Sequence, residues 1–219
     1  MPAVTISAGY GAGGSVVART VAELLGYPLL DRAISSEVAR RLQCTVEEAQ
    51  DGSMKRSFVE RFFTVLAPMA GGVIGTDADS ALQAVLPGQE GELFRDEAEK
   101  IMRAALPGGA VILGRAGAFA LHDEPGVLRV RLFGPKNARI AQAARVQGID
   151  EQTAAGRLPE VDNARAHYVH RLYGRDIDDP EVFHLHLDST AIALSECADL
   201  IVTAFHALGA DAGVTGRRA

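Results

Sequence analysis

The chain has 219 residues, of which 47% are hydrophobic, enough for one sizeable domain with a full core. Its formal net charge of −6 argues against a general nucleic-acid binder, because such proteins carry a basic excess. We expect no membrane span and no signal peptide, and the two distant cysteines, Cys44 and Cys197, fit a reducing cytoplasm.

The first predicted element is a short buried strand at residues 4–7, which leads through a glycine-rich turn into a helix. Gly9, Gly11, Gly13 and Gly14 allow backbone angles that other residues rarely adopt. A glycine loop at a helix N-terminus presents backbone N–H groups and the positive end of the helix dipole to an anion. The sequence therefore predicts a phosphate site here, and the alternative is a tight strand–helix turn that binds no ligand.

This loop departs from a P-loop, which ends Gly-Lys-Ser/Thr. Aligning the second P-loop glycine with Gly13 places Gly14 at the lysine position and Ser15 at the hydroxyl position. The backbone can still cradle phosphate, and Ser15 can still serve Mg²⁺. The ammonium group that reaches the β- and γ-phosphates is missing.

A second strand is predicted at residues 28–31. Asp31, at its carboxyl end, either caps the next helix or faces a ligand. Helices are expected over 32–42 and from Thr45 onward. The less regular stretch 51–92 is either an insertion that can move against the core or a plain helical cover. An apolar helix face at 58–66 within it suits either the core or a homodimer contact.

A helix over 92–106 leads to a continuous apolar run at 110–113, which is typical of a central parallel strand. Arg115 follows the carboxyl end of this strand, where open α/β sheets bind their ligands. On position alone it is either a surface ion-pair residue or a phosphate ligand. A strand at 127–133 and a helix ending at Gln147 come next.

The last part of the chain predicts a short helix at 153–157, a longer one at 159–173 and a strand at 183–187. A final helix over about 191–208 takes Thr190 as its N-cap, and a polar tail starts at Gly209. The strands alternate with helices, so the fold class is α/β: a parallel sheet of about five strands with helices on both faces.

Two further groups of residues carry possible chemistry. His184 and His186 share a face of the last strand, but no third ligand stands at a supporting spacing, so a partly covered strand face is favoured over a zinc site. Arginines gather between 157 and 175, where they either stabilise the charge that spreads in phosphoryl transfer or form ion pairs on a solvated helix.

Several segments, taken in order, resemble the cytidylate kinase-like family. They read TISAGYGAGG at 5–14, GYPLLDR at 26–32, VILGRAG at 111–117, DNARAHY at 162–168 and HLDST at 186–190. No single motif is highly specific, but the ordered set covers nearly the whole chain. Residues 51–92 carry the resemblance least.

The resemblance implies a P-loop nucleoside monophosphate kinase fold, with a nucleotide-binding insertion at about 51–92 and a lid at about 148–180. It implies transfer of a phosphoryl group from ATP to CMP or dCMP with Mg²⁺. By matching position, Asp31 and Arg115 lie on the acceptor side. The lid candidates are Arg157, Arg165 and Arg171, with Arg165 the best aligned, and the donor loop comprises Gly9, Gly11, Ala12, Gly13, Gly14 and Ser15.

Three functions follow from these observations. The first is a kinase that acts on a small pyrimidine nucleotide, in which a lid arginine replaces the missing lysine. The second is a nucleotide-binding module without turnover, which Gly14 at the lysine position favours. The third is a structural α/β domain, which leaves the glycine cluster and the position of Arg115 unexplained.

Overall fold

The computed structural model describes residues 3–31, 89–114 and 116–214. The predicted helices over 32–42 and from Thr45, most of the insertion at 51–92 with its apolar face at 58–66, and Arg115 lie outside these residues. The strands are β1 (Ala3–Ala8), β2 (Leu29–Leu30), β3 (Ala110–Leu113), β4 (Val127–Phe133) and β5 (Leu185–Asp188). The α-helices are α1 (Gly14–Leu25), α5 (Gln89–Ala105), α6 (Gly117–Ala120), α7 (Lys136–Gln147), α8 (Glu151–Tyr173) and α9 (Leu194–Val214).

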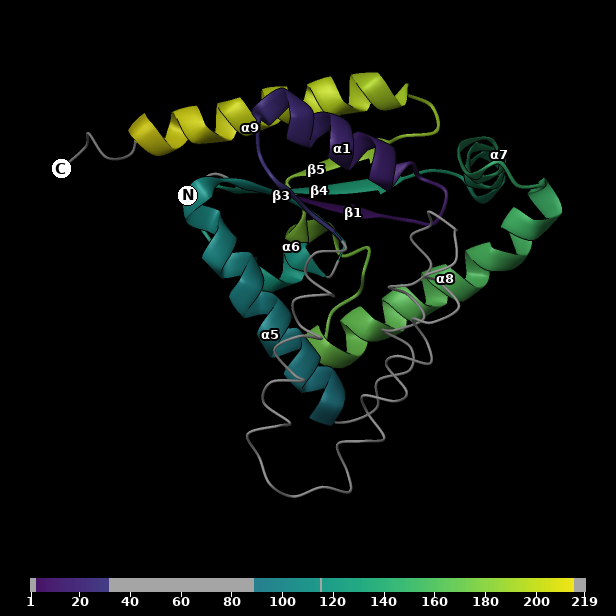
Figure 1. The fold of residues 1–219 in the computed structure, drawn as a ribbon, viewed down its shortest axis with the longest axis horizontal. Helices are drawn as coiled ribbons and strands as arrows, with labels where there is room; N and C mark the ends of the chain where they lie inside the picture. The colour runs from purple at the N-terminus through teal and green to yellow at the C-terminus, as the bar shows by residue number, and fades with distance from the viewer. Residues whose placement is uncertain (1–2, 32–88, 115, 215–219) are drawn as a thin grey trace.

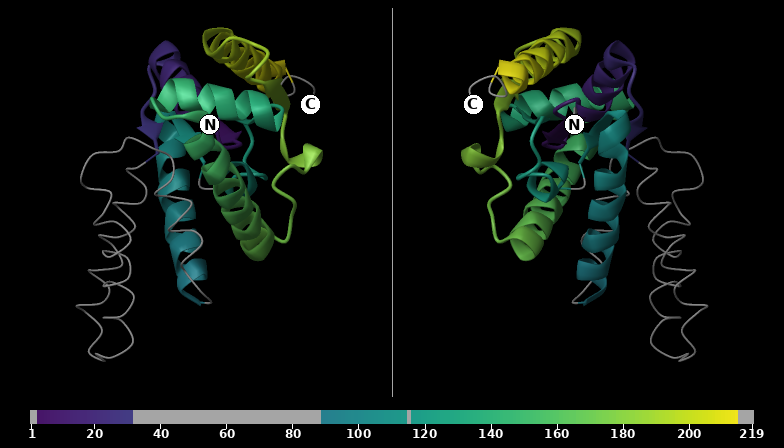
Figure 2. Two further views of the ribbon diagram at one scale, coloured as in Figure 1. Left: turned by 90° about the vertical axis from the view of Figure 1, so that its right-hand side faces the viewer. Right: turned by 90° about the vertical axis from the view of Figure 1, so that its left-hand side faces the viewer.

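The five strands form one parallel sheet in the order β2-β3-β1-β4-β5. Helices α1 and α9 lie on one face, and α5, α6 and α8 lie on the other (Figures 1 and 2). This arrangement confirms the predicted fold class. Strand β1 is central, with β3 on one side and β4 on the other. The loop after β1 therefore lies at the topological switch point of the sheet, where open α/β proteins bind their ligands.

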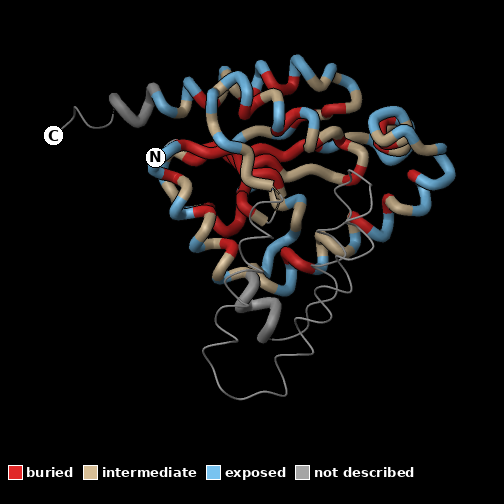
Figure 3. Tube along the Cα trace, viewed as in Figure 1, coloured by how far each residue is buried: buried red, intermediate tan, exposed pale blue. Residues whose placement is uncertain are grey.

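The core forms because side chains alternate between the two faces of each strand. Val4 and Ile6 of β1 pack with Val17 and Val21 of α1, and α9 covers the same cluster. On the other face, Ala3 packs with residues of β3 and α5. Buried residues gather in the central strands (red in Figure 3). Full burial of Ile6 alone is worth about 1.5–3 kcal/mol.

Helix α8 is continuous from Glu151 to Tyr173, so the predicted break between 157 and 159 is wrong. Pro159 lies inside the helix and is exposed to solvent. A proline there removes one backbone hydrogen bond, but tertiary packing of the opposite face offsets the loss. Ala154, Leu158 and Val161 supply that packing, since they are buried against Tyr10 and helix α7.

The chain around β5 also differs from the prediction. The strand starts at Leu185, and α9 starts at Leu194, so Thr190 is not its N-cap. Instead, the Asp188 carboxylate accepts hydrogen bonds from the Thr190 N–H and hydroxyl and from the Ala191 N–H. These bonds, chiefly that of the Thr190 hydroxyl, lower the pKa of Asp188 and form a turn before the helix.

Helix α9 continues to Val214, past the point at which we expected the polar tail. Residues 215–219 lie outside the description.

Candidate functional site

The predicted glycine loop joins β1 to α1 at the carboxyl edge of the sheet. Gly11 and Gly13 have φ angles of 75° and 71°, in the left-handed region that favours glycine. A Cβ atom on Gly11 would lie 2.1 Å from the carbonyl oxygen of Arg139. Both the backbone angle and the close approach of α7 therefore require glycine at this position.

The N-terminus of α1 has the features of an anion site. Gly13 is the N-cap, no side chain caps this end, and the first turn contains no acidic residue. The Val16 and Val17 N–H groups donate to the Gly13 carbonyl. The Gly14 and Ser15 N–H groups, which have no intrahelical acceptor, therefore stand at the positive end of the helix dipole.

Four carbonyl groups of the loop are held by side chains that come from distant parts of the chain. Each donor lies more than 100 residues away in sequence, so the fold fixes the loop from outside. Arg165 Nη1 donates to Ala8 O (2.8 Å), Arg139 Nη1 to Tyr10 O (2.9 Å), Gln142 Nε2 to Gly11 O (3.0 Å) and Ser189 Oγ to Ala12 O (2.7 Å). With its carbonyl oxygens held in this way, the loop is preorganised before a ligand arrives.

Asp162 adds a second tie between the loop and the helices. One carboxylate oxygen accepts from the Tyr10 N–H at 2.8 Å, and the other accepts from Arg139 Nη1 at 2.8 Å. The Arg139 side chain is only 10% exposed, so Asp162 neutralises a buried cation as well as orienting the loop.

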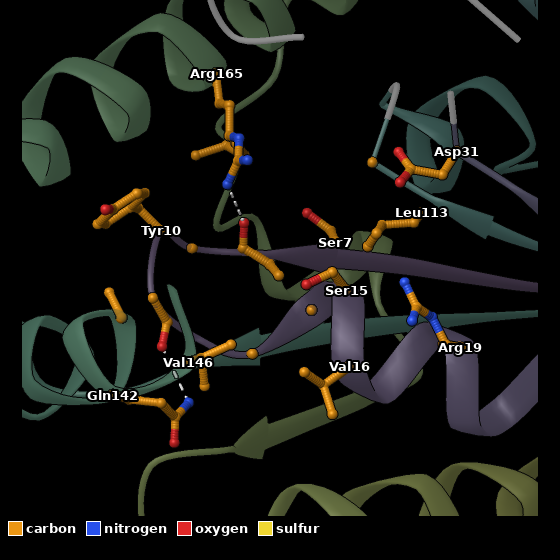
Figure 4. A pocket seen from close by; sticks show the side chains of 18 of the residues that line it. Ser7, Tyr10, Ser15, Val16, Arg19, Asp31, Leu113, Gln142, Val146 and Arg165 are labelled. Atoms are coloured by element: carbon orange, nitrogen blue, oxygen red, sulfur yellow. Dashed lines mark hydrogen bonds between the residues drawn. The ribbon is translucent and has the colours of Figure 1, made fainter. Parts of the chain in front are cut away.

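The loop opens into a cavity of about 360 Å³, which we call the loop cavity. Ser15 and Arg19 line it from α1, while Arg165 reaches it from α8 and Asp31 from the end of β2 (Figure 4). The predicted site residues that line it are Gly9, Gly11, Gly13, Gly14, Ser15, Asp31 and Arg165. Ala12 differs from them, because its side chain is buried in the core between the sheet and α9.

The three predicted lid arginines do not share one position. Arg165 lines the loop cavity, whereas Arg157 and Arg171 do not. An α-helix turns about 100° per residue, so Arg171 lies about 120° around α8 from Arg165, and Arg157 lies about 12 Å away along the axis. The structure therefore brings one of the three to the loop, and the roles of the other two stay predictions.

Arg19 also lines the loop cavity, although its place more than a turn inside the predicted helix made it a poor candidate to replace the missing lysine. It follows Ser15 by four residues on α1, and this spacing places both side chains on one face of the helix. The four-residue spacing in the sequence was therefore enough to predict that Arg19 lies beside Ser15. No local sequence pattern marked Arg139, Gln142 or Ser189 as donors to the loop, because each reaches the loop only through the tertiary fold.

Among the described residues, no group of three or more His, Cys, Asp or Glu side chains is arranged to hold a metal ion. His184 lies just before β5, and its Nδ1 atom faces the Arg129 N–H at 3.2 Å. His186 packs edge-on against Phe183. No helix in the described ranges combines the length and the apolar character that crossing a membrane requires.

Several solved structures share this fold. An uncharacterized protein from Eubacterium ventriosum is 21% identical with a TM-score of 0.64, covering 94% of this chain and 98% of that one. A gluconokinase from Sinorhizobium meliloti is 14% identical with a TM-score of 0.54, covering 98% and 97%. At these identities the likeness shows that the fold is shared and no more.

A sequence relative of another kind covers only part of the chain. The uronate isomerase of Corynebacterium glutamicum is 28% identical over 129 residues, which are 59% of this chain. The match spans only 24% of that protein's length.

The family comparison covers far more of the chain. The sequence profile described as the cytidylate kinase-like family matches residues 3–191, which include the glycine loop, Asp162 and Arg165. The chain belongs to the cytidylate kinase-like family.

Proposed function

We propose that the protein transfers the γ-phosphoryl group of ATP to CMP, dCMP or a similar small phosphate acceptor in the cytoplasm. The observation that carries this proposal is the preorganised glycine loop at the N-terminus of α1, which shares the loop cavity with Arg165. Backbone N–H groups at a helix N-terminus suit the donor phosphates. Membership of the cytidylate kinase-like family supports CMP or dCMP as the acceptor.

The residues present fit Mg²⁺ and a triphosphate. The Ser15 hydroxyl lines the loop cavity next to the Gly14 and Ser15 N–H groups, and Asp31 supplies a carboxylate on another wall. When bound, Mg²⁺ neutralises charge on the phosphates. Asp31 and Arg115 are proposed to orient the acceptor, although the placement of Arg115 lies outside the described residues.

The proposed reaction is an in-line displacement. An oxygen of the acceptor phosphate attacks the γ-phosphorus, the bond from this phosphorus to the β–γ bridging oxygen breaks, and ADP leaves. Negative charge spreads over the equatorial oxygens in the transition state. Gly14 leaves the usual lysine position without a cation, so Arg165 is proposed to supply the positive charge from α8.

The experiment follows ADP release with Mg·ATP and each nucleoside monophosphate in turn. We expect turnover with CMP or dCMP, and a loss of roughly 100-fold or more in kcat for Arg165→Ala, since an arginine in this role contributes about 10³–10⁵. Arg145→Ala is the control, because it removes the same charge from the exposed last turn of α7, outside the loop cavity. Circular dichroism checks that both variants fold.

A second candidate function rests on Gly14, which deprives the loop of the P-loop lysine. In this alternative the protein is a nucleotide-binding module without turnover. Calorimetric binding of ATP together with no ADP release for any acceptor would support this alternative. Equal activity of Arg165→Ala and the wild type would instead refute the role given to Arg165.

A further inference from the structure

A second cavity, of about 530 Å³, lies beside the loop cavity, and its lining includes three arginines. We call it the arginine cavity and define it by Arg131, Arg139 and Arg165. Ala8, Gly9, Arg165 and Ile177 line both cavities, so the end of β1 and the middle of α8 separate them.

Arg131 occupies a position in β4 where an apolar side chain is the rule. Its side chain is only 8% exposed. The guanidinium donates from Nη1 to Ser7 Oγ at 2.9 Å and from Nε to Asp178 Oδ1 at 2.8 Å. Taking a guanidinium out of water costs several kcal/mol, so an arginine at this position needs a strong partner.

The acidic partner in the structure is an exposed one. Asp178 belongs to the loop after α8, and its side chain is 68% exposed. One of its oxygens contacts both Nε and Nη2 of Arg131, the latter at 2.6 Å. A carboxylate that water reaches this easily contributes little net stability, and water or another anion can displace it.

Arg129, two residues earlier on the same face of β4, shows the contrast. It is also buried, but it donates to the backbone carbonyls of Val182 (2.6 Å) and His122 (3.0 Å). It does not line the arginine cavity. Arg129 is thus bonded to fixed groups of the fold, whereas Arg131 presents its guanidinium to a cavity and holds a replaceable carboxylate.

We propose that the arginine cavity is a second anion site, in which Arg131 binds the phosphoryl or carboxylate group of a small organic anion. Asp178 occupies the place of that group in the ligand-free protein. A guanidinium fork suits either oxyanion. The volume exceeds that of a single phosphate, and Phe133 and His186 on the lining offer flat surfaces to the rest of the ligand.

The site can be tested one residue at a time by NMR titration of the full chain with inorganic phosphate and, separately, with malonate. The Nε–H signal of Arg131 reports on the arginine cavity and is identified by its loss in Arg131→Gln. The Arg129 Nε–H signal is the internal control, and the Gly14 and Ser15 amides report on the loop cavity. We expect at least one anion to shift the Arg131 signal in a saturable way and to leave the Arg129 signal in place.

The second variant removes the competing carboxylate from an exposed position. Asp178→Asn is expected to lower the anion Kd measured at Arg131 about two- to fivefold, the scale of an exposed ion pair. Asp176→Asn is the matched control, since it makes the same charge change in the same loop and keeps an oxygen to accept from the Asp178 N–H. A shift of the Arg131 signal with phosphate alone indicates a phosphoryl ligand, and a shift with malonate alone indicates a carboxylate ligand.

The proposal is overturned if neither anion moves the Arg131 signal. It is also overturned if that signal only follows the saturation curve of the Gly14 and Ser15 amides and Asp178→Asn does not change it. The result is independent of the kinase proposal. Loop amides that respond while Arg131 does not would leave the proposed function intact, and the reverse would leave only the second site.

Discussion

Asp162 is the residue on which the geometry of the glycine loop depends most directly. It accepts from the Tyr10 N–H and from Arg139, so one carboxylate fixes both the loop and a buried cation. Asp162→Ala leaves that cation without its counter-ion and the N–H without its acceptor. We expect a loss of about 2–3 kcal/mol in the free energy of unfolding, measured by urea denaturation.

Two further variants separate the two roles of Asp162. Asp162→Asn keeps an oxygen for the Tyr10 N–H but loses the charge, so its stability should lie between those of the wild type and Asp162→Ala. Asp199→Ala removes a carboxylate from the exposed surface of α9 and should change stability by less than about 0.5 kcal/mol. An Asp162→Ala protein as stable as the wild type would show that this carboxylate does not hold the loop.

The same residues show what sequence could and could not predict at this scale. The loop was predictable because its signals are local: four glycines lie between a strand and a helix within seven residues of sequence. Its supports were not, because Arg139 lies 129 residues from Tyr10 and Ser189 lies 177 residues from Ala12. A single sequence carries no record of which distant donor meets which carbonyl group.

Among the elements, the contact of β4 with the chain before β5 depends on a histidine. The His184 N–H donates to Arg129 O at 2.8 Å, and its ring nitrogen Nδ1 lies 3.2 Å from the Arg129 N–H. To accept that hydrogen bond, Nδ1 must carry no proton. Burial lowers the pKa of His184, and the charges of Arg129 and His122 act in the same direction.

This shift predicts a pH dependence of stability. The pKa of the unfolded histidine is about 6.5, above the folded pKa, so the unfolded chain binds more protons when the pH lies between the two values. The contribution of His184 is therefore complete above about pH 6.5 and is lost as the pH falls toward the lower folded value. Urea denaturation between about pH 7.5 and pH 5 should show a flatter profile for His184→Gln than for the wild type.

His170→Gln, a change of the same kind on the exposed surface of α8, is the control and should keep the wild-type slope. An unchanged slope in His184→Gln would mean that His184 does not carry the pH dependence of stability.

Helix α8 shows an element boundary that the sequence alone does not predict. Pro159 predicts a break, but packing of Ala154, Leu158 and Val161 against Tyr10 and α7 keeps the helix whole. Local propensity and tertiary packing disagree there, and packing determines the outcome.

At the scale of the whole molecule, the parallel sheet and the two helical layers were predictable in kind, because strands alternating with helices have few alternatives. The division into a core, an insertion at about 51–92 and a lid at about 148–180 remains a prediction. The described structure gives one physical reason to expect the motion of α8 to be coupled to that of the glycine loop. Arg165 of α8 holds Ala8 O at the end of β1, so a ligand at the loop acts on both segments.

Hydrogen exchange with and without Mg·ATP tests this coupling across the chain. We expect slower exchange in two segments, the loop and first turn of α1 at 9–17 and the stretch of α8 around Arg165, because the ligand orders both walls of one cavity. Helix α9 beyond its first turn should keep its exchange rates, since it does not line the loop cavity. In Arg165→Ala the protection at 9–17 should persist while that in α8 disappears. Protection confined to the loop in the wild type would instead show that α8 is a fixed wall and not a lid.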